Sequence, residues 1–172
     1  NPETAEQNPE EIFQAVVKTI KEVIEVSKID AEDLLCVSFS SAMHSVIAVD
    51  RDGTPLSNCM TWADNRSAKW SEKISKEMNG HEIYLRTGTP IHPMSPLSKI
   101  TWIRNEKQDL FLKTFKFISI KEYVFYKLFK RYIIDYSIAS ATGLFNLKSL
   151  DWDAEAIEVA GITKEHLSEP VN

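Results

Sequence analysis

The sequence contains few glycines and few cysteines, and both shortages narrow the range of functions. Only five glycines occur in 172 residues, so a glycine-rich phosphate-binding loop is hard to place. The two cysteines, Cys36 and Cys59, lie in apolar surroundings without the spacing of metal ligands. Such a pair excludes a disulfide framework and is typical of reduced, buried thiols in a cytoplasmic protein.

The chain also has no excess of positive charge and no long apolar run. Its formal net charge of -5 provides no basic surface for nucleic acid or for an anionic membrane. Its apolar runs are too short to span a bilayer, and no signal peptide is visible. We therefore expect neither nucleic acid nor a membrane as a partner.

What the sequence does contain is an ordinary globular composition, with 43% hydrophobic and 26% charged residues. A chain of 172 residues can bury a sizeable core as one domain or as a large part of one. It begins with Asn1 rather than methionine and ends in a polar stretch, and we interpret both ends as cut from something longer.

The first expected element is a helix that begins after Asn8. Asn8 is a good capping residue, Pro9 suits the first helical position, and Glu11 completes a capping-box pattern. Apolar residues then recur at helical spacing: Ile12, Phe13, Val16, Val17, Ile20, Val23 and Ile24. This pattern predicts an amphipathic helix that packs on another part of the molecule.

Strands and helices alternate along the rest of the chain. The apolar run Leu34–Phe39 predicts a strand buried on both faces, and Ser45–Asp50 predicts a second strand. The following elements are strands at 60–62, 116–120 and 132–134, and helices at 67–79 (ended by Gly80), 97–104, 121–129 and from Asp153 to about Gly161. This alternation predicts an α/β layered domain.

The densest polar cluster, Ser40–Ser45, directly follows the first predicted strand. Residues at the carboxyl end of a core strand are well placed to meet a ligand. His44 offers a sugar hydroxyl both a donor and an acceptor, or offers a carboxylate a positive charge. The alternative is a loop that satisfies its own backbone groups.

A second cluster is Trp62–Arg66. The Trp62 indole can cover the apolar side of a polyol, while Asp64 and Arg66 can hydrogen-bond its hydroxyls. The alternative is the start of a helix, with Asp64 or Asn65 as its cap and a solvated Arg66.

The third cluster, Thr87–Pro96, contains three prolines that stiffen a loop before a helix. His92 and Met94 in this loop are candidates for lining a pocket rigidly. The alternative is a stiff connector without a role in binding.

Together these clusters resemble the FGGY carbohydrate kinase family along essentially the whole chain. The most specific stretch, Met94–Glu106, fits the first signature of that family position by position, and Asp135–Asp153 resembles the stretch that follows it. Ala5–Pro9 resembles the segment that leads into the first helix of these kinases.

Three segments, Ser38–Ser45, Thr61–Ser67 and Arg86–Met94, resemble the bacterial gluconate kinases within the family. Glycerol kinases differ in the first segment, and xylulose kinases differ around residues 90–93. The resemblance therefore implies phosphorylation of gluconate to 6-phosphogluconate. The alternatives are a kinase of another polyol or pentulose (xylulose, ribulose or glycerol) and a non-catalytic sugar-binding module.

The resemblance implies an α/β, ribonuclease H-like (actin-type ATPase) fold in two domains, with ATP and sugar meeting between them. Residues 1–172 would form part of the N-terminal, sugar-binding domain without its first strands, and the C-terminal ATP-binding domain lies outside the chain. The family transfers the γ-phosphoryl group of ATP to a sugar hydroxyl with Mg²⁺ present, in the cytoplasm.

Neither the phosphate loop nor the catalytic aspartate of the family is present, so we expect the fragment alone to be inactive and to lack catalytic, ATP and metal ligands. A homodimer is an expectation for the full-length form. The missing strands would also leave an unpaired sheet edge.

Carried over residue by residue, the resemblance places a set of substrate contacts in the three clusters. They are Met43, His44, Trp62 and Met94, with Asp64, Arg66 and His92 beside them. Lys99 and Trp102 belong to the signature, and we interpret both as structural, with Trp102 in the core. We expect Asp135 to tie down a turn.

Overall fold

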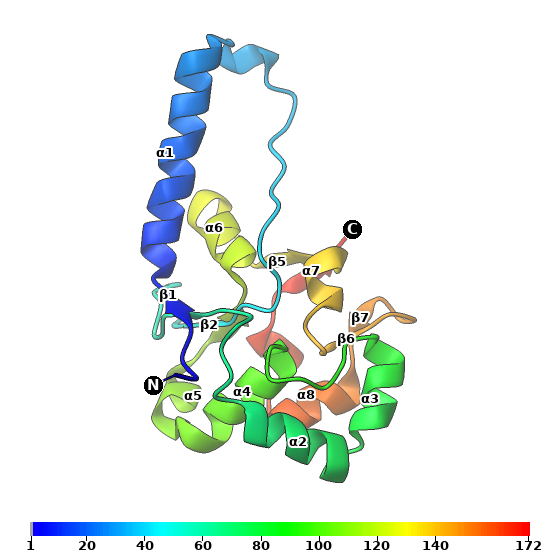
Figure 1. The fold of residues 1–172 in the computed structure, drawn as a ribbon. Coiled ribbons are helices and arrows are strands. Elements are labelled where there is room, and N and C mark those ends of the chain that lie inside the picture. The colour runs from blue at the N-terminus through cyan, green and yellow to red at the C-terminus, as the bar shows by residue number, and fades with distance from the viewer. Residues whose placement is uncertain (1) are drawn as a thin grey trace.

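The computed structural model describes residues 2–172 and shows a long helix that projects from a mixed α/β body (Figure 1). The helices are α1 Pro9–Ser27, α2 Ala68–Glu77, α3 Gly80–Thr87, α4 Pro96–Glu106, α5 Gln108–Lys113, α6 Ile120–Phe129, α7 Tyr136–Ser140 and α8 Ala154–Ala160, with single 3-10 turns at Ala31–Asp33 and Lys164–His166. The strands are β1 Glu6–Gln7, β2 Ile47–Val49, β3 Cys59–Met60, β4 Lys116–Ile118, β5 Ile133–Asp135, β6 Phe145–Asn146, β7 Asp151–Trp152 and β8 Glu169–Val171.

The described strands pair two by two. The pairs β1–β3, β2–β4 and β6–β7 are antiparallel, whereas β5 and β8 run parallel. In the β2–β4 pair, Ile47 lies opposite Ile118 and Val49 lies opposite Lys116. The pair β1–β3 brings the N-terminal segment beside the chain that leads into the second polar cluster.

The predicted start of α1 is confirmed. The Asn8 Oδ1 atom accepts hydrogen bonds from the backbone N–H groups of Glu10 (2.9 Å) and Glu11 (3.4 Å), and Pro9 occupies the first turn. Two of the donors that a helix N-terminus leaves unpaired are thereby satisfied.

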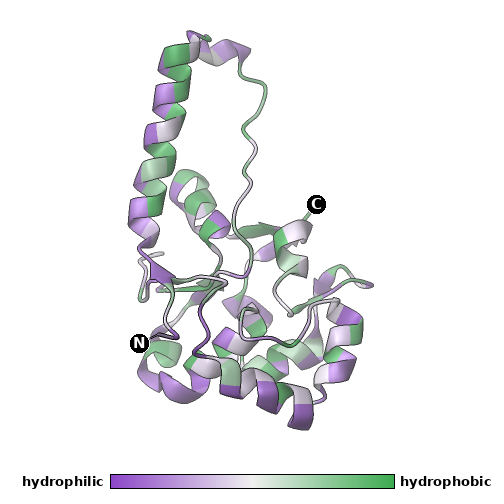
Figure 2. Ribbon diagram, in the orientation of Figure 1, coloured by the Kyte–Doolittle hydropathy of each residue, from purple (hydrophilic) through white to green (hydrophobic). Residues whose placement is uncertain are grey.

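Only the first half of α1 packs on the body, although the whole helix is amphipathic. Ile12 and Phe13 contact the small apolar cluster around β2. Residues 21–30 are all exposed, and Val23 and Val26 keep 60% and 83% of their surface open. Figure 2 shows apolar residues along the projecting part of this helix. The expected packing is therefore confirmed for one half of the helix only.

The prediction of a buried strand at Leu34–Phe39 is wrong. The segment is extended but pairs with no strand among residues 2–172, and Leu35 is 97% exposed. A strand buried on both faces needs neighbours for its backbone N–H and C=O groups, and the described residues place none beside it. Cys36 is therefore exposed, contrary to prediction, whereas Cys59 is buried as predicted.

Several short elements were not predicted, among them α3, α5, α7, β8 and the β6–β7 hairpin. Gly80 does not stop the preceding helix as expected, because α2 already ends at Glu77 and Gly80 begins α3.

The larger of the two apolar clusters surrounds α4, which is buried along Pro96–Ile103. Trp102 is 9% exposed, so its predicted place in the core is confirmed. A helix buried on all sides gives firm support to the side chains that project from it. None of the helices in residues 2–172 combines the length and apolarity needed to cross a bilayer.

Candidate functional site

The three polar clusters, distant in sequence, meet at the side chain of Lys99 on α4. Lys99 is fully buried, and its Nζ atom donates hydrogen bonds to the carbonyl oxygens of His44 (2.6 Å), Thr61 (2.8 Å) and Met94 (2.7 Å). His44 and Met94 belong to the first and third clusters, and Thr61 directly precedes the second. Lys99 therefore joins backbone from three parts of the chain that were singled out separately in the sequence.

The charge of Lys99 matches this environment. Burial lowers the pKa of Lys99 to about 8; the Arg66 guanidinium also lowers it, while Asp64 and the Cys59 thiol oppose the shift. The amine is still mostly protonated at pH 7, and an ammonium group has three N–H donors for three carbonyl acceptors.

His44 is held at both its backbone and its ring. Its φ of 65° lies in the left-handed region, which few non-glycine residues occupy. Its Nδ1 atom lies 2.7 Å from the Ala141 carbonyl oxygen. Because a carbonyl only accepts, Nδ1 must carry a proton, and Nε2 of the neutral ring is left as an acceptor.

The electrostatics favour that neutral ring. Burial lowers the pKa of His44, and the charges of Lys99 and His92 act in the same direction, against the Ala141 hydrogen bond. Of the two roles that the sequence left open for His44, the geometry supports an acceptor for a sugar hydroxyl over a cation for a carboxylate.

Met43 and Trp62 line an open pocket of about 380 Å³. Trp62 is 61% exposed and Met43 is 42% exposed, so both offer apolar surface at the pocket. Its volume lies in the range typical of small-molecule sites, and an indole face suits the apolar side of a polyol. The other lining residues are Ala5, Glu6, Gln7, Ala42, Ser45, Cys59, Thr61 and Ile120.

Sequence reasoning did not name Glu6 and Gln7 as members of this pocket. Both lie in β1, which pairs with β3 and so comes to the second cluster from far away in the sequence. Their position in the Ala5–Pro9 segment was a signal of family resemblance, but only the strand pairing shows where they lie.

Asp64 and Arg66 form an ion-pair cluster beside the pocket. The fully buried Asp64 carboxylate accepts hydrogen bonds from the backbone N–H of Ala5 (3.0 Å) and from Arg66 Nε (3.0 Å). Arg66 also pairs with Glu6 and lies 4.7 Å above the Trp102 ring. Asp64 does not cap α2, whose N-cap residue is Ser67; instead it fixes the N-terminal segment.

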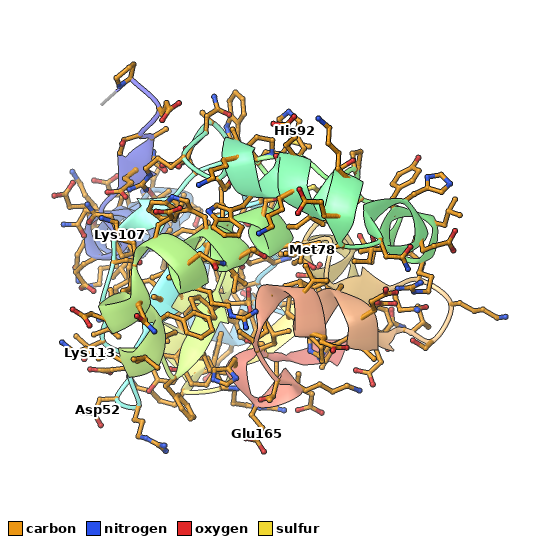
Figure 3. The ribbon with its side chains drawn as sticks, turned by 90° about the horizontal axis from the view of Figure 1, so that it is seen from below. Asp52, Met78, His92, Lys107, Lys113 and Glu165 are labelled. Atoms are coloured by element: carbon orange, nitrogen blue, oxygen red, sulfur yellow. The ribbon has the colours of Figure 1, made fainter. Side chains whose placement is uncertain are left out.

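His92 and Met94 are less closely joined to the pocket. His92 is exposed at the rim of the molecule, and its Nδ1 atom accepts a hydrogen bond from the Met94 backbone N–H at 3.2 Å (Figure 3). Met94 is half-buried, and its carbonyl oxygen accepts a hydrogen bond from Lys99 Nζ. Substrate contact by any of the seven candidate residues stays a prediction.

The Asp52–Thr54 turn has no room for a phosphate group at Gly53. The Asp52–Thr54 segment, which resembles part of a phosphate loop, forms the turn after β2, and the Tyr126 hydroxyl donates to the Asp52 carbonyl (3.1 Å). A Cβ at Gly53 would lie 2.0 Å from the Tyr126 ring, so this turn is filled rather than open. Residues 2–172 also hold no cluster of acidic, histidine or cysteine side chains suited to a metal ion.

A comparison with known protein families matches residues 1–172 to the N-terminal domain of the FGGY family of carbohydrate kinases. The chain belongs to the FGGY family. It is 60% identical over 168 residues to the gluconokinase of Bacillus subtilis (strain 168), an alignment that covers 98% of this chain and 32% of that protein.

Solved structures agree with this FGGY assignment. Gluconate kinase from Lactobacillus acidophilus matches with a TM-score of 0.94 at 36% identity, over 100% of this chain and 34% of that one. Ligand-bound xylulose kinase from the same organism matches with a TM-score of 0.93, with the same identity and coverage. The predicted ribonuclease H-like α/β fold is confirmed, and the chain spans about a third of the length of these relatives.

Proposed function

We propose that this FGGY chain supplies the sugar-binding part of an ATP-dependent kinase that converts gluconate to 6-phosphogluconate in the cytoplasm. The observation that supports this most is the 60% identity to a gluconokinase over nearly the whole chain. ATP and Mg²⁺ would be bound by parts of the polypeptide outside residues 1–172.

In this proposal, residues of the three clusters bind different parts of the sugar acid. Met43 and Trp62 cover the carbon chain, and the Nε2 atom of His44 accepts a hydrogen bond from a hydroxyl. Because Arg66 is already paired with Asp64 and Glu6, we assign the substrate carboxylate to His92, on the same loop as Met94.

A pentulose is the second candidate substrate, because the solved structures do not separate it from gluconate. The chain is as similar in identity to the xylulose kinase structure as to the gluconate kinase structure from Lactobacillus acidophilus, at 36% each. The same pocket would accept the apolar face of either sugar.

A coupled ADP-release assay on the complete reading frame tests the proposal. Gluconate, xylulose, ribulose, glycerol and a sugar-free control are compared in parallel. ADP release that depends on gluconate is the expected result. Release with another sugar would keep the kinase but replace the substrate, and no sugar-dependent release from folded protein would favour a non-catalytic sugar-binding module.

A further inference from the structure

The buried side chain of Lys99 is not among the proposed substrate contacts. We infer that Lys99 is a positioning residue, which holds the three loops of the sugar site in the one arrangement that binds substrate. The inference rests on the proposed function, because it assigns a role within the same site.

The three contacts of Lys99 each fix a residue of the proposed site. Two of the carbonyls belong to candidate contacts, His44 and Met94, and the third belongs to Thr61, directly before Trp62. His44 and Thr61 are 55 and 38 residues away from Lys99 in the chain. No described strand pair or helix joins all three segments, whereas the ammonium contacts all of them within 2.8 Å.

The backbone of His44 shows why such a restraint is needed. A non-glycine residue at φ 65° returns readily to other conformations unless its surroundings hold it. The Lys99 bond to the His44 carbonyl and the Ala141 bond to the His44 ring hold the residue on two sides. Loss of the first bond would free the main chain and move the Nε2 acceptor.

Packing alone does not explain a lysine at this position. The neighbours of Lys99 on the buried part of α4 include Ile100 and Ile103, and an apolar side chain of similar length would fill the same volume. Such an apolar side chain would leave the three carbonyls without donors, so the hydrogen bonds of Lys99, and not the space that it fills, distinguish it from its neighbours. A charged group with a donor for each of three loops indicates a role in their arrangement.

The test compares Lys99→Met with Ile103→Ala in the complete protein. Ile103 lies one turn further along α4, is fully buried and contacts none of the three loops through a hydrogen bond, so it controls for lost stability. The readouts are KM and kcat with gluconate, and hydrogen exchange in segments 41–46, 60–66 and 91–96.

We expect K99M to raise KM for gluconate at least tenfold, with a smaller change in kcat, and to raise exchange in all three segments together. I103A should lower the melting temperature but leave KM and the three segments near wild type. K99M values within twofold of those of I103A, in both KM and exchange, would overturn the inference.

Because K99M leaves three carbonyls without donors and risks unfolding, Lys99→Arg is made in parallel. A planar guanidinium cannot meet three carbonyls around one point, so K99R should also raise KM and exchange. If K99M does not fold, wild-type values for K99R in both readouts overturn the inference. If the unmodified protein releases no ADP with gluconate, the proposed function fails, and exchange alone still decides the role of Lys99.

Discussion

At the scale of single residues, His44 carries the most specific chemical assignment. The Ala141 carbonyl fixes the proton on Nδ1, and burial keeps the ring neutral, so Nε2 is an acceptor. The sequence identified the residue but not this tautomer, because Ala141 lies 97 residues away and shares no motif with it.

Replacing His44 by asparagine tests this assignment. Asparagine also tolerates left-handed backbone and keeps a short side-chain donor, but it has no atom in the place of Nε2. We expect kcat/KM for gluconate to fall at least about tenfold, a loss of roughly 1.4 kcal/mol, with little change in melting temperature. His44→Ala should lose as much activity, and unchanged kinetics in both variants would remove His44 from the site.

Asp64 shows where residue-level reasoning from sequence stops. The sequence left two roles open, a substrate contact or a helix cap, and the structure gives the carboxylate a third, between Ala5 and Arg66. Its partner Ala5 is 59 residues away, so only the tertiary fold reveals the contact.

At the scale of elements, the Asp153 carboxylate joins α3, β6 and α8 through an ion pair and hydrogen bonds. The Asp153 carboxylate caps α8 through the Ala156 N–H (3.0 Å) and accepts from Arg86 Nε (2.7 Å) on α3 and from Asn146 (2.9 Å) on β6. Burial by itself would raise the pKa of Asp153, but Arg86 and the other donors more than offset it and lower the pKa to about 2.

Asp153→Asn should therefore lower the free energy of unfolding by roughly 2 kcal/mol at pH 7. Since the folded pKa of Asp153 is depressed, its contribution is complete above the ordinary value of 3.8 and is lost as pH falls through about 2. Denaturant unfolding at several pH values measures the difference. The exposed Asp109 provides the control, D109N, and a D153N effect that stays constant down to pH 2 would contradict the account.

Length alone did not decide which elements were predictable, since the seven residues of α8 were predicted and the eight residues of α3 were not. The caps and helical spacing that mark α1, α6 and α8 involve residues close together in sequence. Such signals can be recognised without knowledge of the tertiary structure. Asp153 caps α8 through its side chain, whereas Asn79 before α3 makes no side-chain capping bond, so no comparable local signal marks the start of α3. Leu34–Phe39 was misjudged because an apolar run indicates a preference for burial but not whether a neighbour is there to provide it.

At the scale of the whole molecule, apolar surface is concentrated away from the pocket, on two adjoining segments. They are the outer part of α1, where Val26 is 83% exposed, and the extended run that contains Leu35 and Val37, which are 97% and 57% exposed. Extended apolar chain with unpaired backbone groups is prone to pair with another copy.

The 172-residue chain alone should therefore self-associate, and Leu35→Lys with Val37→Lys should reduce the association. Light scattering over a range of concentrations measures it. Leu112→Lys on α5 is the control, because Leu112 is 74% exposed but lies outside these two segments. A chain that stays monomeric throughout, or an equal effect of L112K, would show that residues 34–39 are not responsible.

The fold of the whole molecule was predictable from its resemblance to a family, and the layout of the site was not. Alternating patterns indicated α/β layers, and the Met94–Glu106 stretch indicated the family. The meeting of three clusters at Lys99 depends on backbone carbonyls, whose positions no side-chain pattern records.

The most direct test of the proposed sugar site is acrylamide quenching of Trp62 fluorescence in the complete protein, with and without gluconate. Trp62 is 61% exposed, whereas Trp70, Trp102 and Trp152 are at most 9% exposed. We expect gluconate to shield Trp62 and lower the quenching constant, and we expect no such change in a folded Trp62→Phe variant. Quenching that is unaffected at gluconate concentrations that saturate ADP release would contradict the placement of the sugar between Met43 and Trp62.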